Sequence, residues 1–150
     1  MRSVFLAVLA LTPGCSLLGI SPRQVPYEHH EVTTPSGVIV QDILAGTGPA
    51  VLPTSEVTLN YVARVQGGGP IDSSYDRGLP ISFRMGRAPI LGWNEGLLGM
   101  RPGGQRHLVV PPYLAYGDDG VEGVVPPRAT LEFDIELVEA KPSGADAPDE

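Results

Sequence analysis

The sequence predicts an α+β fold in which a curved antiparallel β-sheet wraps around one short α-helix. Three observations favour this fold class. Apolar and polar residues alternate with a period of two in several segments, as in strands that have one buried face. The 19 Gly and 16 Pro residues are scattered between short apolar runs without a repeat, which is typical of a β-rich domain with many turns. Only one short segment has the apolar spacing of a helix.

The expected strands follow one another along the chain. Val38–Val40 together with Ile43–Leu44 form the first. Over residues 57–65 the apolar side chains occupy alternate positions, so they share one face of a second strand. The run Gly67–Pro70 then forces a turn. The residues that share this face are Val57, Leu59, Tyr61, Ala63 and Val65.

Three further strands are expected towards the C-terminus. The alternation continues over residues 81–85, and another strand over 106–110 is closed by Pro111–Pro112. The pattern is clearest over residues 131–137, where apolar residues alternate with acidic ones. This last pattern indicates a half-buried antiparallel strand with one solvated face.

One short helix is expected over residues 93–100. Trp93, Leu97 and Met100 have the spacing of a single helical face. A sheet packed over such a helix is a common place for an apolar ligand pocket.

The first 15 residues have the pattern of an export signal. Arg2 is followed by the apolar run Val4–Leu11, which is too short to span a bilayer as a helix. Cys15 comes directly after a small residue at the end of this segment. The arrangement resembles a bacterial lipoprotein signal, in which the cysteine is lipidated; the alternative is an ordinary cleaved signal with an incidental cysteine. We therefore expect export to the periplasm or outer membrane, with a lipid on Cys15 as the membrane anchor.

The rest of the chain divides into three parts. Residues 16–34 are polar and contain two prolines, so we expect a flexible linker. Residues 35–140 carry the strand pattern and form the expected domain. Residues 141–150 form a small acidic tail for which we expect disorder. No segment resembles a dimerisation helix, so a monomer is expected.

Composition and motifs exclude several classes of function. The net charge of -7 disfavours a nucleic-acid partner, and the few basic residues are too dispersed to hold an anionic lipid surface. The only cysteine lies in the export segment, and the sequence has no G-x-S-x-G, Walker or H-E-x-x-H motif. Glu28–Glu31 contains residue types that bind metals, but it lies in the predicted linker and is interpreted as a solvated patch. No cofactor and no metal are expected.

Four motifs carry a resemblance to a known family. They occur in the family's order between about Gly37 and Glu139, and the chain resembles the FKBP-type, macrolide-binding peptidyl-prolyl isomerases. The resemblance implies a curved antiparallel sheet around a short helix, with a pocket between sheet, helix and loops. The motifs are IDSSYDRGLPISF, ILGWNEGLLGMRPGGQRHLVVPP, YLAYGDDG and VVPPRATLEFDIEL.

The resemblance also implies the site. Trp93 would form the pocket floor, and the Ile90 N–H and the Tyr116 hydroxyl would donate hydrogen bonds to carbonyls of a bound peptide. Asp72 would lie at the pocket edge near Tyr61 and pair with Arg77. The residues expected to be catalytic are Tyr61, Asp72, Trp93, Tyr116 and Phe133. Those expected to bind substrate are Ile71, Arg77, Ile81, Phe83, Ile90, Val124 and Val125. For Phe83 the alternative is a purely structural place in the core.

The implied activity is isomerisation of X-Pro bonds in exported or unfolded polypeptides, and a macrolide is a further expected ligand. The sequence departs from the family pattern at Ile71 and Ile81, where macrolide-binding members commonly carry Phe. The segment 86–93 is one residue shorter, with Pro89 before Ile90. These departures leave open a binding or chaperone module with the same fold but weak turnover. The export segment and linker leave open a second alternative, a structural lipoprotein of the envelope.

Overall fold

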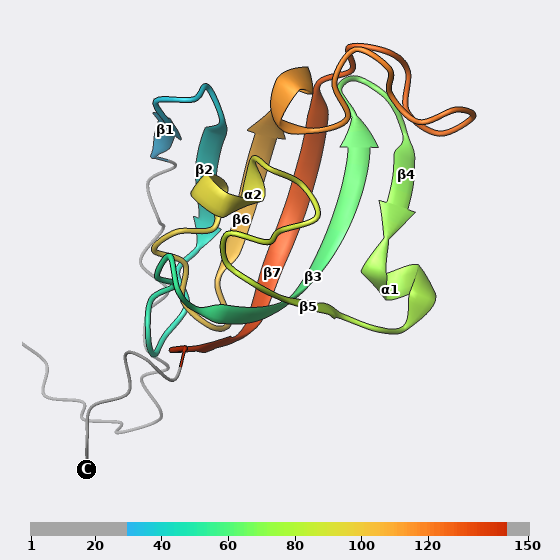
Figure 1. The fold of residues 1–150 in the computed structure, drawn as a ribbon. Helices are drawn as coiled ribbons and strands as arrows, with labels where there is room; N and C mark the ends of the chain where they lie inside the picture. Colours follow the sequence, from blue (N-terminus) through green and yellow to red (C-terminus); the bar gives the residue numbers. More distant parts are fainter. Residues whose placement is uncertain (1–29, 144–150) are drawn as a thin grey trace, which may run out of the picture.

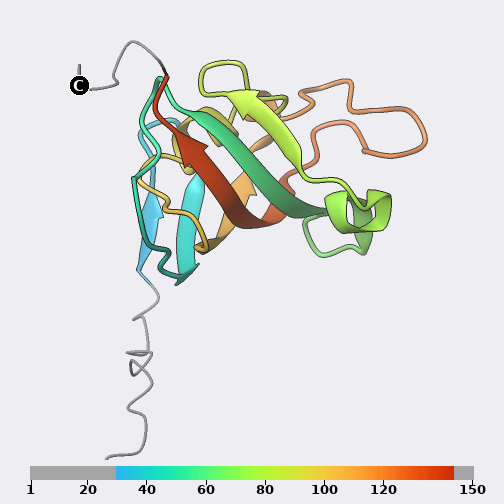
Figure 2. The same ribbon diagram turned by 90° about the horizontal axis from the view of Figure 1, so that it is seen from below.

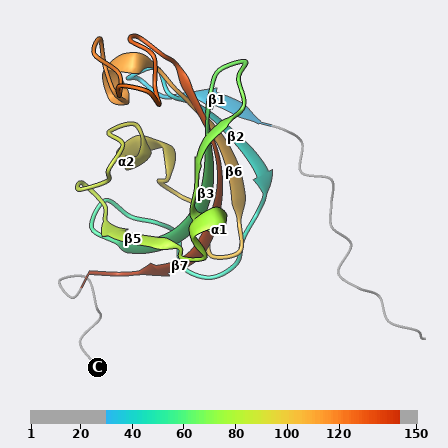
Figure 3. The ribbon, with the colours of Figure 1, turned by 90° about the vertical axis from the view of Figure 1, so that its right-hand side faces the viewer.

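The computed structural model describes residues 30–143, in which seven strands form one curved antiparallel sheet (Figure 1). The helical segments are α1 (Ser74–Arg77), α2 (Trp93–Gly96) and the 3-10 helix η1 (Pro112–Leu114). The sheet curves around α2, which lies on its concave side (Figure 3), so the predicted fold class is confirmed. The strands are β1 (Glu31–Thr33), β2 (Ile39–Leu44), β3 (Glu56–Val65), β4 (Pro70–Ser73), β5 (Ile81–Arg84), β6 (Gln105–Val110) and β7 (Leu131–Lys141).

The order of strands in the sheet is β1-β2-β6-β7-β3-β4, and β5 pairs with β3 as well. On one side, β3 therefore has two partners in succession. Its N-terminal half pairs with β5 through Glu56–Leu59, and its C-terminal half pairs with β4 through Val62–Arg64. On the other side, β3 pairs with β7 along its whole length (Figure 2). This arrangement makes β3 and β7 the floor of the concave face.

The core lies between the concave face of the sheet and α2. The apolar residues that alternate over residues 57–65 and 131–137 point into this space, as their pattern predicted. In β7 the apolar residues Leu131, Phe133, Ile135 and Leu137 are buried, while Asp134 on the opposite face is exposed. Burial of these side chains removes apolar surface from water and is the main favourable contribution to folding. The buried residues of β3 and β7 are Val57, Leu59, Tyr61, Ala63, Leu131, Phe133, Ile135, Leu137 and Ala140.

The predicted helix over residues 93–100 is shorter in the structure. Regular helix ends at Gly96, and the chain continues to Met100 as turns that include Gly99 at a φ of 78°. A positive φ is a common way to end a helix, and glycine adopts it without steric cost. Trp93, Leu97 and Met100 are nevertheless all buried, as their spacing predicted.

Two glycines let α2 approach β6 closely. A Cβ atom at Gly92 would lie 2.6 Å from a methyl group of Val110, and one at Gly96 would lie 2.6 Å from a methyl group of Leu108. The buried Arg106 side chain of β6 donates hydrogen bonds to the carbonyls of Gly96 (2.7 Å) and Leu98 (2.9 Å). These contacts fix both ends of α2 against the sheet, and Trp93 begins this helix.

Four short elements were not predicted: β1, β4, α1 and the 3-10 helix η1. The linker was expected to reach residue 34, but β1 pairs its three residues with β2 in the register Glu31↔Gln41 to Thr33↔Ile39. All three residues are exposed, so no alternating pattern marked the strand. The one-turn helix α1 is held by caps, because the Ser73 side chain accepts from the Asp76 N–H and Gly78 ends the turn.

Several sequence predictions fall wholly or partly outside the described residues. These are the export segment 1–15 with Cys15, most of the linker 16–34, and all but the first three residues of the tail 141–150. Within residues 30–143, no helix has the length and apolar character needed to cross a membrane.

Candidate functional site

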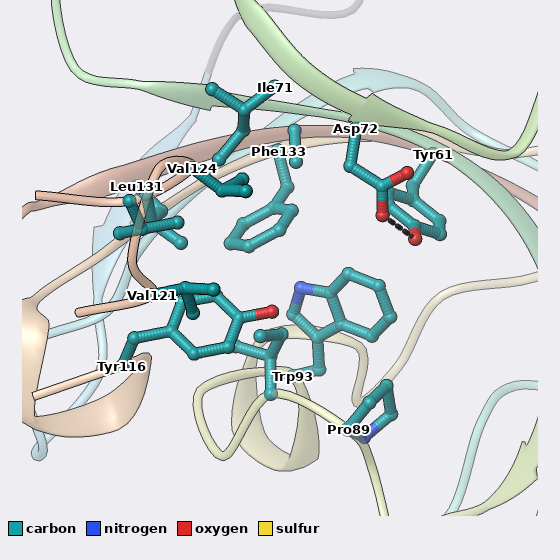
Figure 4. Close-up of a pocket in the computed structure, with 13 residues that line it drawn as sticks. Tyr61, Ile71, Asp72, Pro89, Trp93, Tyr116, Val121, Val124, Leu131 and Phe133 are labelled. Carbon is teal, nitrogen blue, oxygen red and sulfur yellow. Dashed lines mark hydrogen bonds between the residues drawn. The ribbon is translucent and has the colours of Figure 1, made fainter. Parts of the chain in front are cut away.

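An apolar cavity of about 200 Å³ opens between the concave face of the sheet, α2 and the loop 115–130, which we call the flap (Figure 4). Its lining comes from β3, β4, β7, the first residue of α2, the segment before α2, and the flap. These parts of the chain are distant in sequence, and only the folded sheet brings them together. The lining residues are Tyr61, Ala63, Ile71, Asp72, Pro89, Ile90, Trp93, Tyr116, Val121, Val124, Val125, Leu131 and Phe133.

Trp93 forms the base of the cavity, and its side chain is 1% exposed. Two aromatic rings meet the indole edge to face: Tyr61 at a centroid distance of 5.2 Å and Phe133 at 5.1 Å. Phe83 stacks on it at 5.9 Å with an interplanar angle of 28°. Edge-to-face and offset-stacked pairs are the favoured aromatic geometries. The three contacts therefore hold the indole in one orientation.

A polar network closes one side of the cavity. The Tyr61 hydroxyl donates to Asp72 Oδ2, and Arg77 Nη1 donates to Asp72 Oδ1. Arg77 Nη2 also donates to the Tyr61 hydroxyl at 2.7 Å, and its guanidinium lies 5.5 Å from the centre of the Tyr61 ring. The Asp72 carboxylate accepts a further hydrogen bond from the Ser73 N–H at 2.8 Å. The network orients the Tyr61 ring that forms the cavity wall.

The network shifts the pKa values of its members in opposite directions. Burial, together with the hydrogen bond to Asp72, raises the pKa of Tyr61. Burial also disfavours ionisation of Asp72, but the hydrogen bond from Tyr61 and the charge of Arg77 outweigh it and lower the pKa of this carboxyl below its ordinary value. At neutral pH Asp72 is therefore an anion that accepts from a neutral tyrosine.

Lowering the pH should destabilise the protein partly through Asp72. Because its pKa is depressed in the folded state, the ionised carboxylate stabilises the fold above the ordinary value of 3.8, and this contribution is lost as the pH falls through the lower folded value. Asp72→Asn removes the charge, so we expect it to lower the free energy of unfolding at pH 7 and to flatten its decrease below pH 4. Urea unfolding at several pH values measures both effects.

The exposed Asp76 on α1 offers a matched control for this prediction. Asp76→Asn should leave the acid dependence close to that of the unaltered protein. An acid dependence that is the same in Asp72→Asn and in the unaltered protein would contradict the role given to Asp72.

The segment before α2 is positioned by a residue that the sequence did not point to. Asn94 Oδ1 accepts from the Gly86 N–H at 2.8 Å and the Ala88 N–H at 3.3 Å, which fixes the short approach to the cavity. Pro89 and Ile90 then line the cavity. Within the described part of the chain, no acceptor takes the Ile90 N–H. This donor is therefore available to a ligand.

The flap covers the other side of the cavity. Val121 and Val125 exchange two backbone hydrogen bonds of 2.8 Å, which form a narrow loop that presents Val124 between them. Tyr116 lies near the start of the flap and is 43% exposed, and its ring points into the cavity (Figure 4). Its hydroxyl has no hydrogen-bond partner among residues 30–143. The mouth of the cavity thus holds a second available donor.

The structure places most of the predicted site residues in the lining, but three lie outside it. Arg77 contacts the outer side of the Tyr61 wall, Phe83 stacks on Trp93, and Ile81 pairs with Leu59 on β3 and packs against the core. All three were expected among the substrate-binding residues, Arg77 through its pairing with Asp72. The structure shows that pairing, and it packs Phe83 and Ile81 against Trp93 and the core. The lining residues that the sequence did not indicate are Ala63, Pro89, Val121 and Leu131.

The arrangement favours non-covalent chemistry. Among the described lining residues there is no Ser, Cys, His or Lys that could serve as a nucleophile or base. The cavity can instead desolvate a small apolar group on the indole while two donors reach carbonyl oxygens beside it. Such a site recognises a ligand by its shape and polarity and does not form a covalent bond with it.

A family profile matches this part of the chain. It is described as FKBP-type peptidyl-prolyl cis-trans isomerase, and it covers residues 48–138. The match includes all the lining residues and the whole of α2, so it concerns the cavity itself.

Two relatives illustrate the similarity. The FKBP-type peptidyl-prolyl cis-trans isomerase FkpA of Escherichia coli is 44% identical over 111 residues, which cover 74% of this chain and 40% of FkpA. Its crystal structure superposes with a TM-score of 0.69 at 42% identity, over 78% of this chain and 54% of that one. The FK506-binding protein of Neisseria meningitidis serogroup B is 39% identical over 103 residues, covering 68% of this chain and 94% of the relative. The chain thus spans less than half the length of FkpA but nearly all of the Neisseria protein.

Proposed function

The chain belongs to the FKBP-type peptidyl-prolyl cis-trans isomerase family, and on this premise we propose that it accelerates rotation about X-Pro peptide bonds in polypeptides. The observation that carries the proposal is the apolar cavity built on Trp93, which has no Ser, Cys, His or Lys among its described lining residues and has two available hydrogen-bond donors. The described residues of one chain complete this cavity, so the activity needs no second copy.

The reaction requires no covalent step. Rotation about a peptide bond is opposed by roughly 18–20 kcal/mol because it breaks amide resonance. In the twisted amide the carbonyl oxygen carries less charge than in the planar form, so the twisted form loses less by leaving water. A cavity that desolvates this carbonyl and holds the twisted conformer lowers the barrier, because it binds the transition state better than the ground state.

Each part of the site has a proposed role in this mechanism. The proline ring rests on Trp93 between the Tyr61 and Phe133 rings, and the valines of the flap cover it. The Ile90 N–H and the Tyr116 hydroxyl donate to carbonyls on either side of the ring. Asp72 acts as a positioning residue for Tyr61. Ile71, Val124 and Val125 complete the apolar wall that contacts the substrate.

Tyr116→Phe tests the proposal at the mouth of the cavity. It keeps the ring and removes one donor, so kcat/KM for a short X-Pro peptide should fall by about threefold to tenfold, the factor expected for one hydrogen bond. Stability should change little because the hydroxyl bonds to no described residue. Cis-to-trans relaxation of the peptide measures the rate, and urea unfolding checks the fold.

Tyr113 supplies the matched control. It is also exposed and lies three residues away, but its hydroxyl donates to the Ser36 carbonyl, outside the cavity. Tyr113→Phe should leave the rate unchanged. A folded, unaltered protein that gives no acceleration with several residues before proline would rule out catalysis and leave a binding module.

A macrolide is a further proposed ligand of the same cavity. The name of the Neisseria relative states that it binds FK506, and the family resemblance extends over the cavity. Ile71 lines the wall with an aliphatic side chain where macrolide-binding members commonly carry a phenyl ring. The smaller apolar contact area should weaken the affinity for such ligands.

We also propose that the protein is exported and anchored by a lipid on Cys15, as the signal-like pattern of residues 1–15 suggests. Because Cys15 is the only cysteine, Cys15→Ser should abolish incorporation of labelled palmitate and move the protein from the membrane to the soluble fraction. Metabolic labelling and fractionation of expressing bacteria measure both. Labelling that persists in the serine variant would contradict the proposal.

A further inference from the structure

Residues 85–90, which we call the approach segment, lead from β5 towards α2 and bring one free backbone donor to the cavity. The four N–H groups of residues 85–88 all have acceptors. Pro89 has no N–H. Ile90 is therefore the first residue of the segment whose N–H lacks an acceptor in the described part of the chain. Backbone donors in enclosed places are nearly always paired, so this one indicates a ligand.

Two of the four paired N–H groups are held by one side chain, that of Asn94. Its Oδ1 atom accepts from the Gly86 N–H at 2.8 Å and from the Ala88 N–H at 3.3 Å. The other two N–H groups of residues 85–88 donate to backbone carbonyls, which a side-chain substitution does not remove. A single oxygen atom thus binds the segment at two points just before Pro89 and Ile90.

The helix that carries Asn94 also holds the far end of the approach segment. The N–H of Trp93, the first residue of α2, donates to the Ile90 carbonyl at 3.0 Å. Arg106 of β6 in turn fixes α2 through the Gly96 and Leu98 carbonyls. The direction of the Ile90 N–H is therefore set relative to the indole on which the proposed substrate rests.

We propose that Asn94 is a positioning residue that aims the Ile90 N–H at a carbonyl of the bound peptide. This inference rests on the proposed isomerase function. Pro89 fixes its own φ, so few conformations connect Ala88 to Ile90, and the bonds to Asn94 select one of them. Without this acceptor the N–H groups of Gly86 and Ala88 turn to water. The approach segment then changes its course, and the donor moves out of hydrogen-bond distance of the ligand.

Asn94→Leu removes the acceptor and keeps the branched shape of the side chain. Asn94 is only half-buried and Gly86 is exposed, so the protein should remain folded in urea unfolding. For a short X-Pro peptide, kcat/KM should fall by about threefold to tenfold, because at most one hydrogen bond to the ligand is lost. Asn94→Asp keeps an oxygen at the same place and should stay within about twofold of the unaltered protein.

Glu95 provides the matched control on the same helix. Its carboxylate accepts from the Ser36 hydroxyl, and neither residue lines the cavity. Glu95→Gln should therefore leave kcat/KM within about twofold of the unaltered protein.

A second replacement shows whether Asn94 acts through Ile90. Nonsense suppression with the α-hydroxy acid that corresponds to isoleucine puts an ester oxygen in place of the Ile90 N–H in the full-length protein. This change alone should lower kcat/KM by about threefold to tenfold. In the ester protein, Asn94→Leu should add less than about twofold, because the donor that Asn94 positions is gone. A residue that only stabilises the fold would lower the rate equally in both backgrounds.

Cis-to-trans relaxation of the peptide measures all these rates. Four results would overturn the inference: an unchanged kcat/KM in Asn94→Leu, a loss of the same size in Asn94→Asp, an equal loss in both backgrounds, or an ester protein with full activity. Failure of the proposed function is distinguishable from these results, because the unaltered protein then does not accelerate the relaxation at all.

Discussion

Replacing Trp93 with alanine should abolish isomerase turnover and lower the free energy of unfolding by about 3–5 kcal/mol. The indole is 1% exposed, and three aromatic rings lie within 6 Å of it, centre to centre. Its removal empties the base of the cavity, and the facing rings lose their packing partner. Cis-to-trans relaxation of an X-Pro peptide and urea unfolding, both on the full chain, measure the two effects.

Two further substitutions separate the loss of the site from the loss of stability. Leu137 on β7 is fully buried but does not line the cavity, so Leu137→Ala should cost about 2–5 kcal/mol and keep the activity of each folded molecule. Trp93→Phe restores an aromatic ring at the bottom of the cavity and should recover most of the stability and part of the turnover. A folded Trp93→Ala protein with undiminished turnover would contradict the position of the site.

Gly120→Ala should displace the flap and thereby lower kcat/KM by at least about tenfold. A small displacement of the groups that position a substrate is enough for such a loss. Gly120 has a φ of 64°, and a Cβ atom there would overlap the carbonyl oxygens of Val125 and Pro126, the latter at 2.6 Å. These atoms belong to the backbone and cannot rotate away. The flap must therefore open at the Val121–Val125 pair, which displaces the valines that cover the substrate.

Gly123 provides the control within the same loop. Its φ of 74° is similar, but no atom lies within 4 Å of a Cβ placed there. Gly123→Ala should show only the conformational cost of the left-handed region, about 1–2 kcal/mol, with turnover largely retained. Isomerase rates and thermal unfolding of the two variants measure the difference. Equal losses of activity in both would show that strain, and not the overlap at Gly120, disturbs the flap.

Prediction from the sequence was best where a pattern is local and repeated. The alternation over residues 57–65 and 131–137 was sufficient to predict both long strands and their buried faces, because one side of each faces the core throughout. The strand β1 and the helix α1 escaped prediction because each is too short for a period to appear. The predicted helix was longer than α2. Met100 is buried and has helical spacing from Trp93 and Leu97, but the regular helix ends before it, at Gly96.

The site was predictable only in part, for a related reason. Motifs that resemble a family indicated Trp93, Tyr116 and Phe133, and these three line the cavity. Motifs did not show that Asn94 holds the approach to the cavity or that Ala63 and Leu131 line its wall. Those roles depend on contacts between segments that are distant in the sequence.

By itself, the sequence determined the fold class, the inward faces of the long strands and the position of Trp93 at the start of the helix, since these follow from periodicity and local motifs. Only the tertiary structure decided which aromatic residues reach the ligand. Tyr61 and Phe133 lie on the face of β3 and β7 that curves towards α2, whereas Phe83 on β5 stacks on Trp93 outside the cavity lining. The physical reason is that β3 pairs with β5 along one half and with β4 along the other, so the surroundings of each ring are set by strand register and sheet curvature, not by its neighbours in the chain.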